Sequence, residues 1–374
     1  MRPIKLSLPE LAGNEKKYCN EAIESTWITP LGPFVDRFEK DLENWLPTGH
    51  VVALSSGTAA IHLALADAGV TKGDKVICQS MTFAASANPI VYLGADPVFV
   101  DSEYDTWNMS PELLKKAITQ LSEKPKAIIV TDLYGMPAKH DGIRAIADEA
   151  GITVIEDSAE AIGSRYKGKH SGLQGDYGVL SFNGNKMITT SGGGALIVPS
   201  LKSAKHVLHL ATQARESTTE YFHKEIGYNY RLSNISAAIG CAQLEDLDRR
   251  VKRRKAIHRL YTELLSDCKY IEVKQNPNCD FDSNFWLTTI LLSEDSPLSP
   301  LQLCERLKEL NIETRRLWRP MHTQPIYANT ISFLDGTSED LFARGLCLPS
   351  STTLSDDEIK YVASEIKRLI EEID

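Results

Sequence analysis

The chain has 374 residues and a formal net charge of −9, and the apolar and charged fractions are those of an ordinary soluble protein. Its length exceeds the usual limit of a single core, which predicts a large domain and a smaller one. The acidic balance argues against nucleic-acid partners, and the lack of an apolar run of ~20 residues argues against a membrane span. The N-terminal stretch lacks the apolar segment of a secretory signal, so we expect a cytoplasmic protein.

The cysteines also limit the possible classes. Seven are scattered along the chain, and no CxxC pair occurs. This pattern is typical of reduced thiols and argues against both a disulfide framework and a zinc site. We therefore expect no metal.

Short β-branched runs alternate with helical patterns from residue 50 to about residue 200. The predicted strands are 50–54, 75–79, 97–101, 127–132, 153–157 and 195–198. Such alternation is typical of an α/β fold with a mostly parallel sheet covered on both faces by helices. Ligands of these sheets bind at the carboxyl ends of the strands.

A long helical stretch is predicted over about 233–266, and it contains the basic run RRVKRRK at 249–255. This run could bind nucleic acid, but the acidic residues just before it favour a solvated helix face. A strand at 286–292, a helix at 301–310 and an amphipathic helix at 354–373 then indicate a smaller α+β domain. We place the large domain at 1–250 and the small C-terminal domain at 251–374.

A phosphate-binding loop is one interpretation of Ser55-Ser56-Gly57-Thr58, which lies between a predicted strand and a helix. Free amides at the helix start and the hydroxyls of Ser56 and Thr58 can hold an anion, although an ordinary serine cap gives the same pattern. The glycines at 192–194 precede a strand, so they do not form a dinucleotide-binding loop, and Lys186 lacks the spacing of a P-loop. These glycines could simply form a tight turn.

An isolated lysine and a carboxylate at a strand tip complete the pattern. Asp157 ends a predicted strand, where it could cap a helix, bind a metal or pair with a buried cation. Lys186 could be solvated, or it could be an amine kept neutral for attack on a carbonyl by burial or by a nearby cation. A phosphate cradle, a carboxylate and a lysine are the parts that pyridoxal phosphate requires, because the lysine binds its aldehyde and the carboxylate pairs with its ring nitrogen.

Long segments over nearly the whole chain resemble the DegT/DnrJ/EryC1/StrS sugar aminotransferases. The resemblance is carried by SSGTAAIHLAL, MTFAASANPIVYLGADPVFVD, TWNMSP, EDSAEAIGS, SFNGNK, GYNYRLSNI, LWRPMHTQPIY and GLCLPS. It implies a pyridoxal-phosphate enzyme of the aspartate-aminotransferase fold (fold type I). The SFNGNK and TWNMSP segments are most similar to the bacillosamine-type subgroup, which transfers an amino group from L-glutamate to the C4 ketone of a UDP-linked 4-keto-6-deoxy-N-acetylhexosamine.

Three alternatives stay open at this point. The substrate could be a dTDP- or GDP-linked 3- or 4-keto sugar, as in perosamine synthesis. The chain could be a non-catalytic pyridoxal-phosphate-binding regulator, for which the basic run is the only support. A sugar dehydratase of the same fold is disfavoured, because those relatives replace the lysine with histidine and this chain has Lys186.

The resemblance also implies roles for particular positions. Lys186 corresponds to the lysine that binds the cofactor covalently and moves the proton, and Asp157 corresponds to the partner of the ring nitrogen. The other implied cofactor contacts are Gly57, Thr58 and Ser181 at the phosphate, Phe83 and Ala159 on the two ring faces, and Glu160 at the phenolic oxygen. Asn229 corresponds to an asparagine that reaches the phosphate of the neighbouring subunit, which implies a homodimer with shared active sites.

The implied substrate contacts lie in two segments. One is N-terminal and the other belongs to the small domain; they comprise Thr26, Trp27, Ile28 and Thr29, and Trp318, Arg319, Met321 and His322. Arg319 would offset the diphosphate charge, whereas His322 could instead be a packing residue. Arg231 and Arg215 are candidates for the donor carboxylate. His206 and His209 lie one helical turn apart but lack a third metal ligand.

Overall fold

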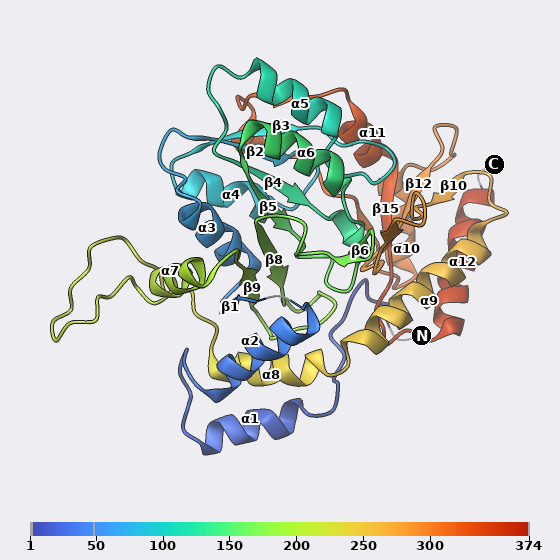
Figure 1. The fold of residues 1–374 in the computed structure, drawn as a ribbon. Coiled ribbons are helices and arrows are strands. Elements are labelled where there is room, and N and C mark those ends of the chain that lie inside the picture. The colour runs from blue at the N-terminus through green and yellow to red at the C-terminus, as the bar shows by residue number, and fades with distance from the viewer. Residues whose placement is uncertain (1–2, 48, 373–374) are drawn as a thin grey trace.

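A mostly parallel sheet of eight strands forms the centre of the larger part of the molecule in this computed structural model, which describes residues 3–47 and 49–372 (Figure 1). β9 runs antiparallel to both of its neighbours, and the other adjacent strands pair in parallel. In spatial order the strands are β1 (Val51–Leu54), β9 (Gly194–Ile197), β8 (Tyr177–Ser181), β5 (Thr153–Asp157), β4 (Ala127–Thr131), β2 (Lys75–Gln79), β3 (Asp96–Val100) and β14 (Ser332–Phe333). The predicted mostly parallel α/β fold is confirmed.

Helices cover both faces of this sheet, which explains why the central residues of its strands are apolar on both sides. One face packs against α3 (Gly57–Asp67), α4 (Ala84–Tyr92) and α7 (Leu201–Ala211). The other packs against α5 (Pro111–Gln120), α6 (His140–Ala150), α2 (Pro33–Trp45) and α8 (Asn234–Leu244). α1 (Glu15–Glu24) lies on the outer side of α8 (Figure 1), and a short helix η1 (Leu133–Gly135) follows β4.

The second sheet is small and antiparallel. Its strands, in spatial order, are β10 (Ile271–Val273), β12 (Thr288–Leu292), β15 (Gly345–Leu348) and β13 (Arg315–Arg316). Its core is closed by α9 (Leu247–Leu265), α10 (Pro300–Glu309) and α12 (Asp356–Glu371). Capping boxes at Ser299 and Ser355 fix where α10 and α12 begin. The predicted end of the last helix, residue 373, lies outside the described residues.

The predicted helix over 233–266 is in fact two helices. α8 ends at Leu244 and α9 begins at Leu247, so Glu245 and Asp246 form a break. In Figure 1, α8 runs under the large sheet and α9 continues toward the small one. The sequence pattern missed the break because the apolar stripe continues across it: Leu247 and Val251 of α9 still pack in the core that α8 joins, and only the later turns of α9 reach the core of the small sheet.

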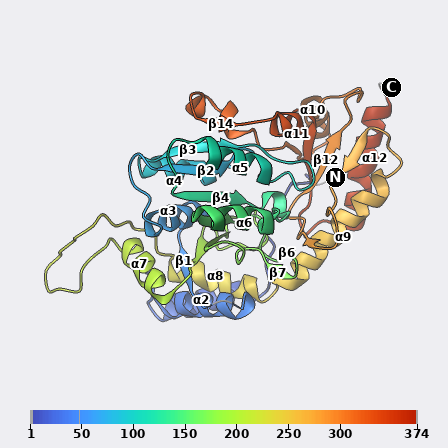
Figure 2. The same cartoon turned by 45° about the horizontal axis from the view of Figure 1, so that its top comes forward.

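The chain crosses between its two parts at further points. The short strand β14 lies at the edge of the large sheet, although it follows the small-sheet strand β13 in sequence. Figure 2 shows this C-terminal segment passing over the edge of the large sheet at β3. A three-stranded sheet likewise joins β11 (Phe281–Asp282) to β6 (Arg165–Tyr166) and β7 (Lys169–His170). The division at residue 250 stays a prediction.

The remaining short elements are η2 (Met321–Thr323), η3 (Pro325–Tyr327) and α11 (Thr337–Arg344).

The basic run at 249–255 is a solvated helix face only in part: Arg249 and Lys252 are exposed, but two other arginines of the run are buried, which the sequence prediction missed. Arg250 and Arg254 are each only 2% exposed. The outer members Arg249, Arg253 and Lys255 pair with acidic residues. Residues four apart share one side of a helix, so a continuous basic run on α9 necessarily turns two cations inward. Within the part of the chain that the structure describes, no helix is long and apolar enough to cross a membrane.

Candidate active site

A cavity of about 280 Å³ lies at the carboxyl ends of β1, β4, β5 and β8. It lies at the strand ends that the sequence predicted for a ligand. The lining residues are Ser55, Ser56, Gly57, Thr58, Ile61, Thr82, Phe83, Ala85, Thr131, Asp157, Ala159, Glu160, Ser181, Asn183, Asn185, Lys186, Gly192, Gly193, Trp286 and Trp318. Lys186 is the one lysine or arginine among these residues, so the cavity itself offers no second permanent cation.

One end of the cavity is the start of α3. Ser56 caps the helix, because its Oγ accepts a hydrogen bond from the amide of Ala59 at 3.0 Å. The amides of Gly57 and Thr58 lie in the first turn, where an α-helix leaves its N–H groups unpaired. Ser181 ends β8 close by: a Cβ on Gly57 would lie 3.2 Å from the Ser181 Cβ. This arrangement can hold a phosphate group.

The glycine run also contributes to this end of the cavity. Gly194 begins β9, and a Cβ there would lie only 2.4 Å from the carbonyl carbon of Ser56. Glycine is therefore required for β9 to lie against the start of α3. The sequence showed a turn here, but the close approach of the two segments depends on strand pairing between β1 and β9.

A buried carboxylate, Asp157, occupies the end of β5. Its Oδ2 accepts from the Ser86 hydroxyl at 2.6 Å, and its Oδ1 accepts from the Ala159 amide at 3.2 Å. Burial raises the pKa of Asp157, and these hydrogen bonds oppose that shift only in part. None of the ion pairs found among the described residues includes Asp157. It is thus a carboxylate available to a cation inside the cavity.

Lys186 faces the carboxylate of Glu160, which lines the same cavity as Asp157. The lysine Nζ lies 3.3 Å from Glu160 Oε1 and 4.1 Å from the centre of the Trp286 ring. Glu160 is fixed in turn, because its Oε2 accepts from the Tyr134 amide at 2.7 Å. Sequence reasoning missed Trp286, since WLTTILL has the pattern of an ordinary strand and carries no separate functional signal.

A buried charge network lies behind Asp157. His140 Nε2 is 2.7 Å from Asp132 Oδ1 and 3.6 Å from Glu156 Oε1. Each acid also accepts hydrogen bonds from the protein: Asp132 from Ser158, and Glu156 from the amide of Gly172. The atoms lie within 4.8 Å of one another, but these hydrogen bonds account for their proximity. The network thus fixes the residues on either side of Asp157 in the sequence: Glu156 contacts His140, and Ser158 donates to Asp132.

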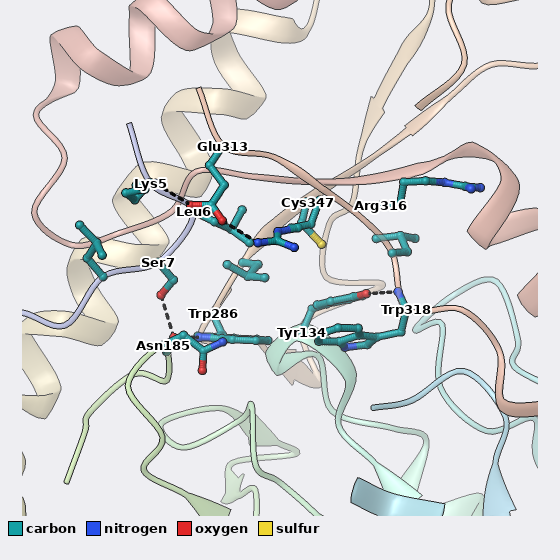
Figure 3. A pocket seen from close by; sticks show the side chains of 14 residues that line it. Lys5, Leu6, Ser7, Tyr134, Asn185, Trp286, Glu313, Arg316, Trp318 and Cys347 are labelled. Atoms are coloured by element: carbon teal, nitrogen blue, oxygen red, sulfur yellow. Dashed lines mark hydrogen bonds and ion pairs between the residues drawn. The ribbon is translucent and has the colours of Figure 1, made fainter. Parts of the chain in front are cut away.

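A second chamber of about 450 Å³ adjoins the first and shares Asn185, Trp286 and Trp318 with it (Figure 3). The ring of Tyr134 lies nearly parallel to those of Trp286 and Trp318, at centroid distances of 6.5 and 6.2 Å. Trp286 and Trp318 line both chambers, and Tyr134 lines the second chamber beside them. Three cations and one acid line the second chamber: Lys5, Arg315, Arg316 and Glu313.

The predicted small-domain contacts have different surroundings. Trp318 lines the cavity, where its ring lies 5.2 Å from that of Phe83. Arg319 lies over the Phe342 ring, and Met321 is buried in the core of the large sheet. His322 contacts Ser80 through Nδ1 at 2.7 Å and Glu339 through Nε2 at 3.1 Å.

Two other predicted groups lie away from this chain's cavity. None of Thr26, Trp27, Ile28 and Thr29 lines it; this segment packs on Asn234 at the start of α8. Asn229 accepts from Gln213 Nε2 at 3.1 Å, at the base of a loop that projects from the molecule after α7 (Figure 1). The roles of all these residues stay predictions.

The other singled-out residues have protein partners. Arg231 pairs with Glu39 and donates to the Ala53 carbonyl, so it is not free to bind a donor carboxylate at the cavity. Arg215 lies over the Tyr221 ring in the projecting loop. His206 and His209 both contact Glu225, and His206 also contacts Asp67.

The residues of the first cavity fit pyridoxal phosphate. The start of α3 can take the phosphate, and Asp157 can pair with a protonated ring nitrogen. Lys186 lines the same cavity and is the amine that would bond to the aldehyde. A Cβ at Gly193 would lie 2.1 Å from Thr190 Oγ1, so the floor of the cavity also depends on a residue without a side chain.

Comparison with known proteins agrees with this geometry. The DegT/DnrJ/EryC1/StrS aminotransferase family matches residues 9–367. EpsN of Bacillus subtilis (strain 168), named as a candidate pyridoxal phosphate-dependent aminotransferase, is 48% identical over 96% of this chain and 93% of its own. GDP-perosamine synthase of Escherichia coli O157:H7 is 37% identical over 98% of each chain. The PLP form of Spr1654 from Streptococcus pneumoniae, named as a candidate sugar aminotransferase, superposes with a TM-score of 0.91 at 27% identity over 100% of each chain, and its PMP form is also solved.

The fold and the cavity define a sugar aminotransferase that depends on pyridoxal phosphate. The chain belongs to the DegT/DnrJ/EryC1/StrS aminotransferase family. The predicted fold class, family, enzyme class and cofactor are therefore confirmed.

Proposed function

We propose that the enzyme transfers an amino group from L-glutamate to the C4 ketone of a UDP-linked 4-keto-6-deoxy-N-acetylhexosamine. The observation that carries this proposal is the presence of Lys186, Asp157 and the start of α3 on one cavity. An amine, a buried carboxylate and a phosphate cradle are the three groups that amino transfer on this cofactor requires. The closeness to the bacillosamine-type subgroup supports the choice of sugar.

Each residue has a defined task in this reaction. The bound cofactor supplies an electron sink for the carbanion. Gly57, Thr58 and Ser181 bind its phosphate, and Asp157 keeps its ring nitrogen protonated. With the cofactor bound, Lys186 would be the base that takes the proton from the donor α-carbon and returns it in the transfer. Glu160 Oε1 accepts a hydrogen bond from the lysine Nζ at 3.3 Å and so orients the amine that would bond to the cofactor.

The donor carboxylates require cations that the first cavity does not provide. The adjoining chamber provides them, because Lys5, Arg315 and Arg316 outnumber its one acid. Arg315 and Lys5 both pair with Glu313, which leaves an excess of positive charge. This charge supports a dicarboxylate such as L-glutamate as the donor.

A GDP-linked 4-keto sugar is the second candidate substrate. It is favoured by the 37% identity with GDP-perosamine synthase over 98% of each chain. The two candidates differ in the nucleotide base and in the N-acetyl group of the sugar.

We also propose a homodimer with shared active sites. The loop after α7 projects away from the body of the chain (Figure 1) and exposes Tyr221 at 83% and Ile226 at 81%. Exposed apolar groups of this size support an interface. Asn229 lies at the base of this loop and not on its own cavity, as expected for a residue that serves the partner's site.

The test follows the two halves of the reaction separately: first the transfer of the amino group from L-glutamate to the cofactor, and then its transfer from the cofactor to the sugar. L-glutamate alone should convert the enzyme from the absorbance of its PLP form to that of its PMP form. The PMP form should then aminate one member of a panel of UDP-, GDP- and dTDP-linked keto sugars, detected by mass spectrometry. The proposed substrate is wrong if a GDP- or dTDP-linked sugar reacts faster than the UDP-linked one.

The matched variants are Lys186→Ala and Lys202→Ala, which changes an exposed lysine of α7. Lys186→Ala should lose both half-reactions, whereas Lys202→Ala should keep them. Amino transfer by folded Lys186→Ala at the wild-type rate would rule out the role given to this lysine.

A further inference from the structure

Arg254 is a buried cation without an acidic partner. It lies near the middle of α9, is 2% exposed and takes part in none of the ion pairs formed by the described residues. Burial lowers the pKa of its guanidinium to about 9, and the nearby Arg250 adds to this shift. A charge in such a place is costly unless its hydrogen bonds have a specific purpose.

The hydrogen bonds of Arg254 lead to the lysine loop. Its Nη1 donates to the Trp286 carbonyl at 2.7 Å, and its Nη2 donates to Ser7 Oγ at 2.8 Å. Ser7 Oγ and Trp286 Nε1 then both donate to the carbonyl of Asn185, each at 2.7 Å. Four hydrogen bonds thus form a closed ring, and Figure 3 shows Ser7 and Trp286 meeting at Asn185.

This ring reaches Lys186 by two routes. Asn185 is the preceding residue, so fixing its carbonyl fixes the start of the lysine backbone. Trp286 presents its ring at 4.1 Å from the lysine Nζ. The guanidinium of Arg254 holds the backbone of Trp286 and the hydroxyl of Ser7, because its planar fork can satisfy two acceptors in one rigid geometry.

We propose that Arg254 is a positioning residue, which holds Lys186 in place through Ser7 and Trp286. This inference rests on the proposed role of Lys186. The four segments that meet here are far apart in sequence: the N-terminal stretch, the lysine loop, α9 and the approach to β12. Because α9 and β12 belong to the core of the small sheet, the ring also couples the position of the lysine to that core.

The test compares Arg254→Met and Ser7→Ala with a matched control, Arg250→Met. Arg250 is equally buried, one turn earlier on α9, and its Nη2 donates to the Glu10 carbonyl at 2.7 Å without touching the lysine loop. The first readout is the rate at which an amine-reactive reagent labels Lys186 in the cofactor-free protein, measured by mass spectrometry. The second is the dissociation constant of pyridoxal phosphate in the full chain.

Arg254→Met and Ser7→Ala should label Lys186 several-fold faster, since the amine is released from Trp286. Both should also weaken cofactor binding on the order of tenfold. The double variant should be no worse than Arg254→Met alone, because both changes break one ring. Arg250→Met should lower the melting temperature but leave the labelling rate and the cofactor affinity unchanged.

Wild-type labelling in folded Arg254→Met and in Ser7→Ala would overturn the proposal. An equal change in Arg250→Met would also overturn it, because the effect would then be general loosening. If Arg254→Met does not fold, Ser7→Ala decides the question by the same two readouts. Labelling of the cofactor-free protein does not depend on which sugar reacts, so its result is separate from the fate of the proposed function.

Discussion

Single side chains near the site carry charges that water would normally stabilise. His140 lies between Asp132 and Glu156, and all three are buried. Burial raises the pKa of Glu156 to about 7, and the nearby Asp132 also raises it. The pKa of His140 is raised as well, because the two acids outweigh the effect of its burial. Both groups therefore bind protons more tightly in the folded chain than in the unfolded one.

This difference predicts how stability depends on pH. A raised folded pKa gives stability that is present at low pH and is lost as the pH rises through the folded value. For Glu156 the loss falls between about pH 4.5 and 7, and for His140 it lies above its ordinary value of about 6.5. The free energy of unfolding, measured with urea from pH 5 to pH 8, should therefore fall on the order of 2 kcal/mol more in the wild type than in a His140→Gln, Glu156→Gln double variant. Parallel pH profiles for the two proteins would contradict this account.

At the scale of elements, the position of one strand shapes the phosphate end of the site. β9 pairs with β1 and β8, and its first residue meets the start of α3. A tight turn alone would tolerate a small side chain at Gly194, but this contact leaves no space for one. The glycine requirement thus comes from the pairing of strands that are far apart in sequence.

Gly194→Ala should therefore displace the start of α3. We expect a loss of about 1–3 kcal/mol in the free energy of unfolding and weaker cofactor binding. The matched control is Gly184→Ala in the same segment, where a Cβ would meet nothing within 4 Å and the change should stay within about 0.5 kcal/mol. Urea unfolding and cofactor titration of both variants measure the contrast, and equal losses would refute the contact argument.

At the scale of the whole molecule, the single chain contains the cofactor-binding groups but leaves part of its predicted site apart. Lys186 and Asp157 share the cavity, whereas Asn229 and the segment from Thr26 to Thr29 do not line it. The proposed dimer accounts for this separation, because a partner's loop would supply the missing groups.

Mixed dimers provide the test of that arrangement. Lys186→Ala and Asn229→Ala should each be nearly inactive alone. After the two are unfolded and refolded together in equal amounts, the mixture should regain about a quarter of the wild-type activity, since about half of the dimers are mixed and each mixed dimer has one of its two sites intact. Light scattering should show a dimer. If mixtures that are confirmed to contain mixed dimers regain no activity, the two subunits do not share their active sites.

The sequence by itself predicted the mostly parallel α/β sheet, six of its eight strands and the residue types of a cofactor site, but not β8, β14 or the spatial order of the strands. These features follow from local patterns: apolar strands of fixed period, a capped helix start, an acid at a strand tip and an isolated lysine. Gly57 and Asp157 follow or end predicted strands, and the structure brings both to one edge because the carboxyl ends of parallel strands meet there; Lys186, from the loop before β9, lines the same cavity.

Only the tertiary structure decided which side chains surround that edge. In the folded chain the Trp286 ring contacts the amine of Lys186, Arg254 is buried, and Arg231 forms an ion pair with Glu39. It also placed the second chamber beside the first. Each of these contacts joins residues that are distant along the chain, and sequence patterns report local periodicity and not the packing of one element against another.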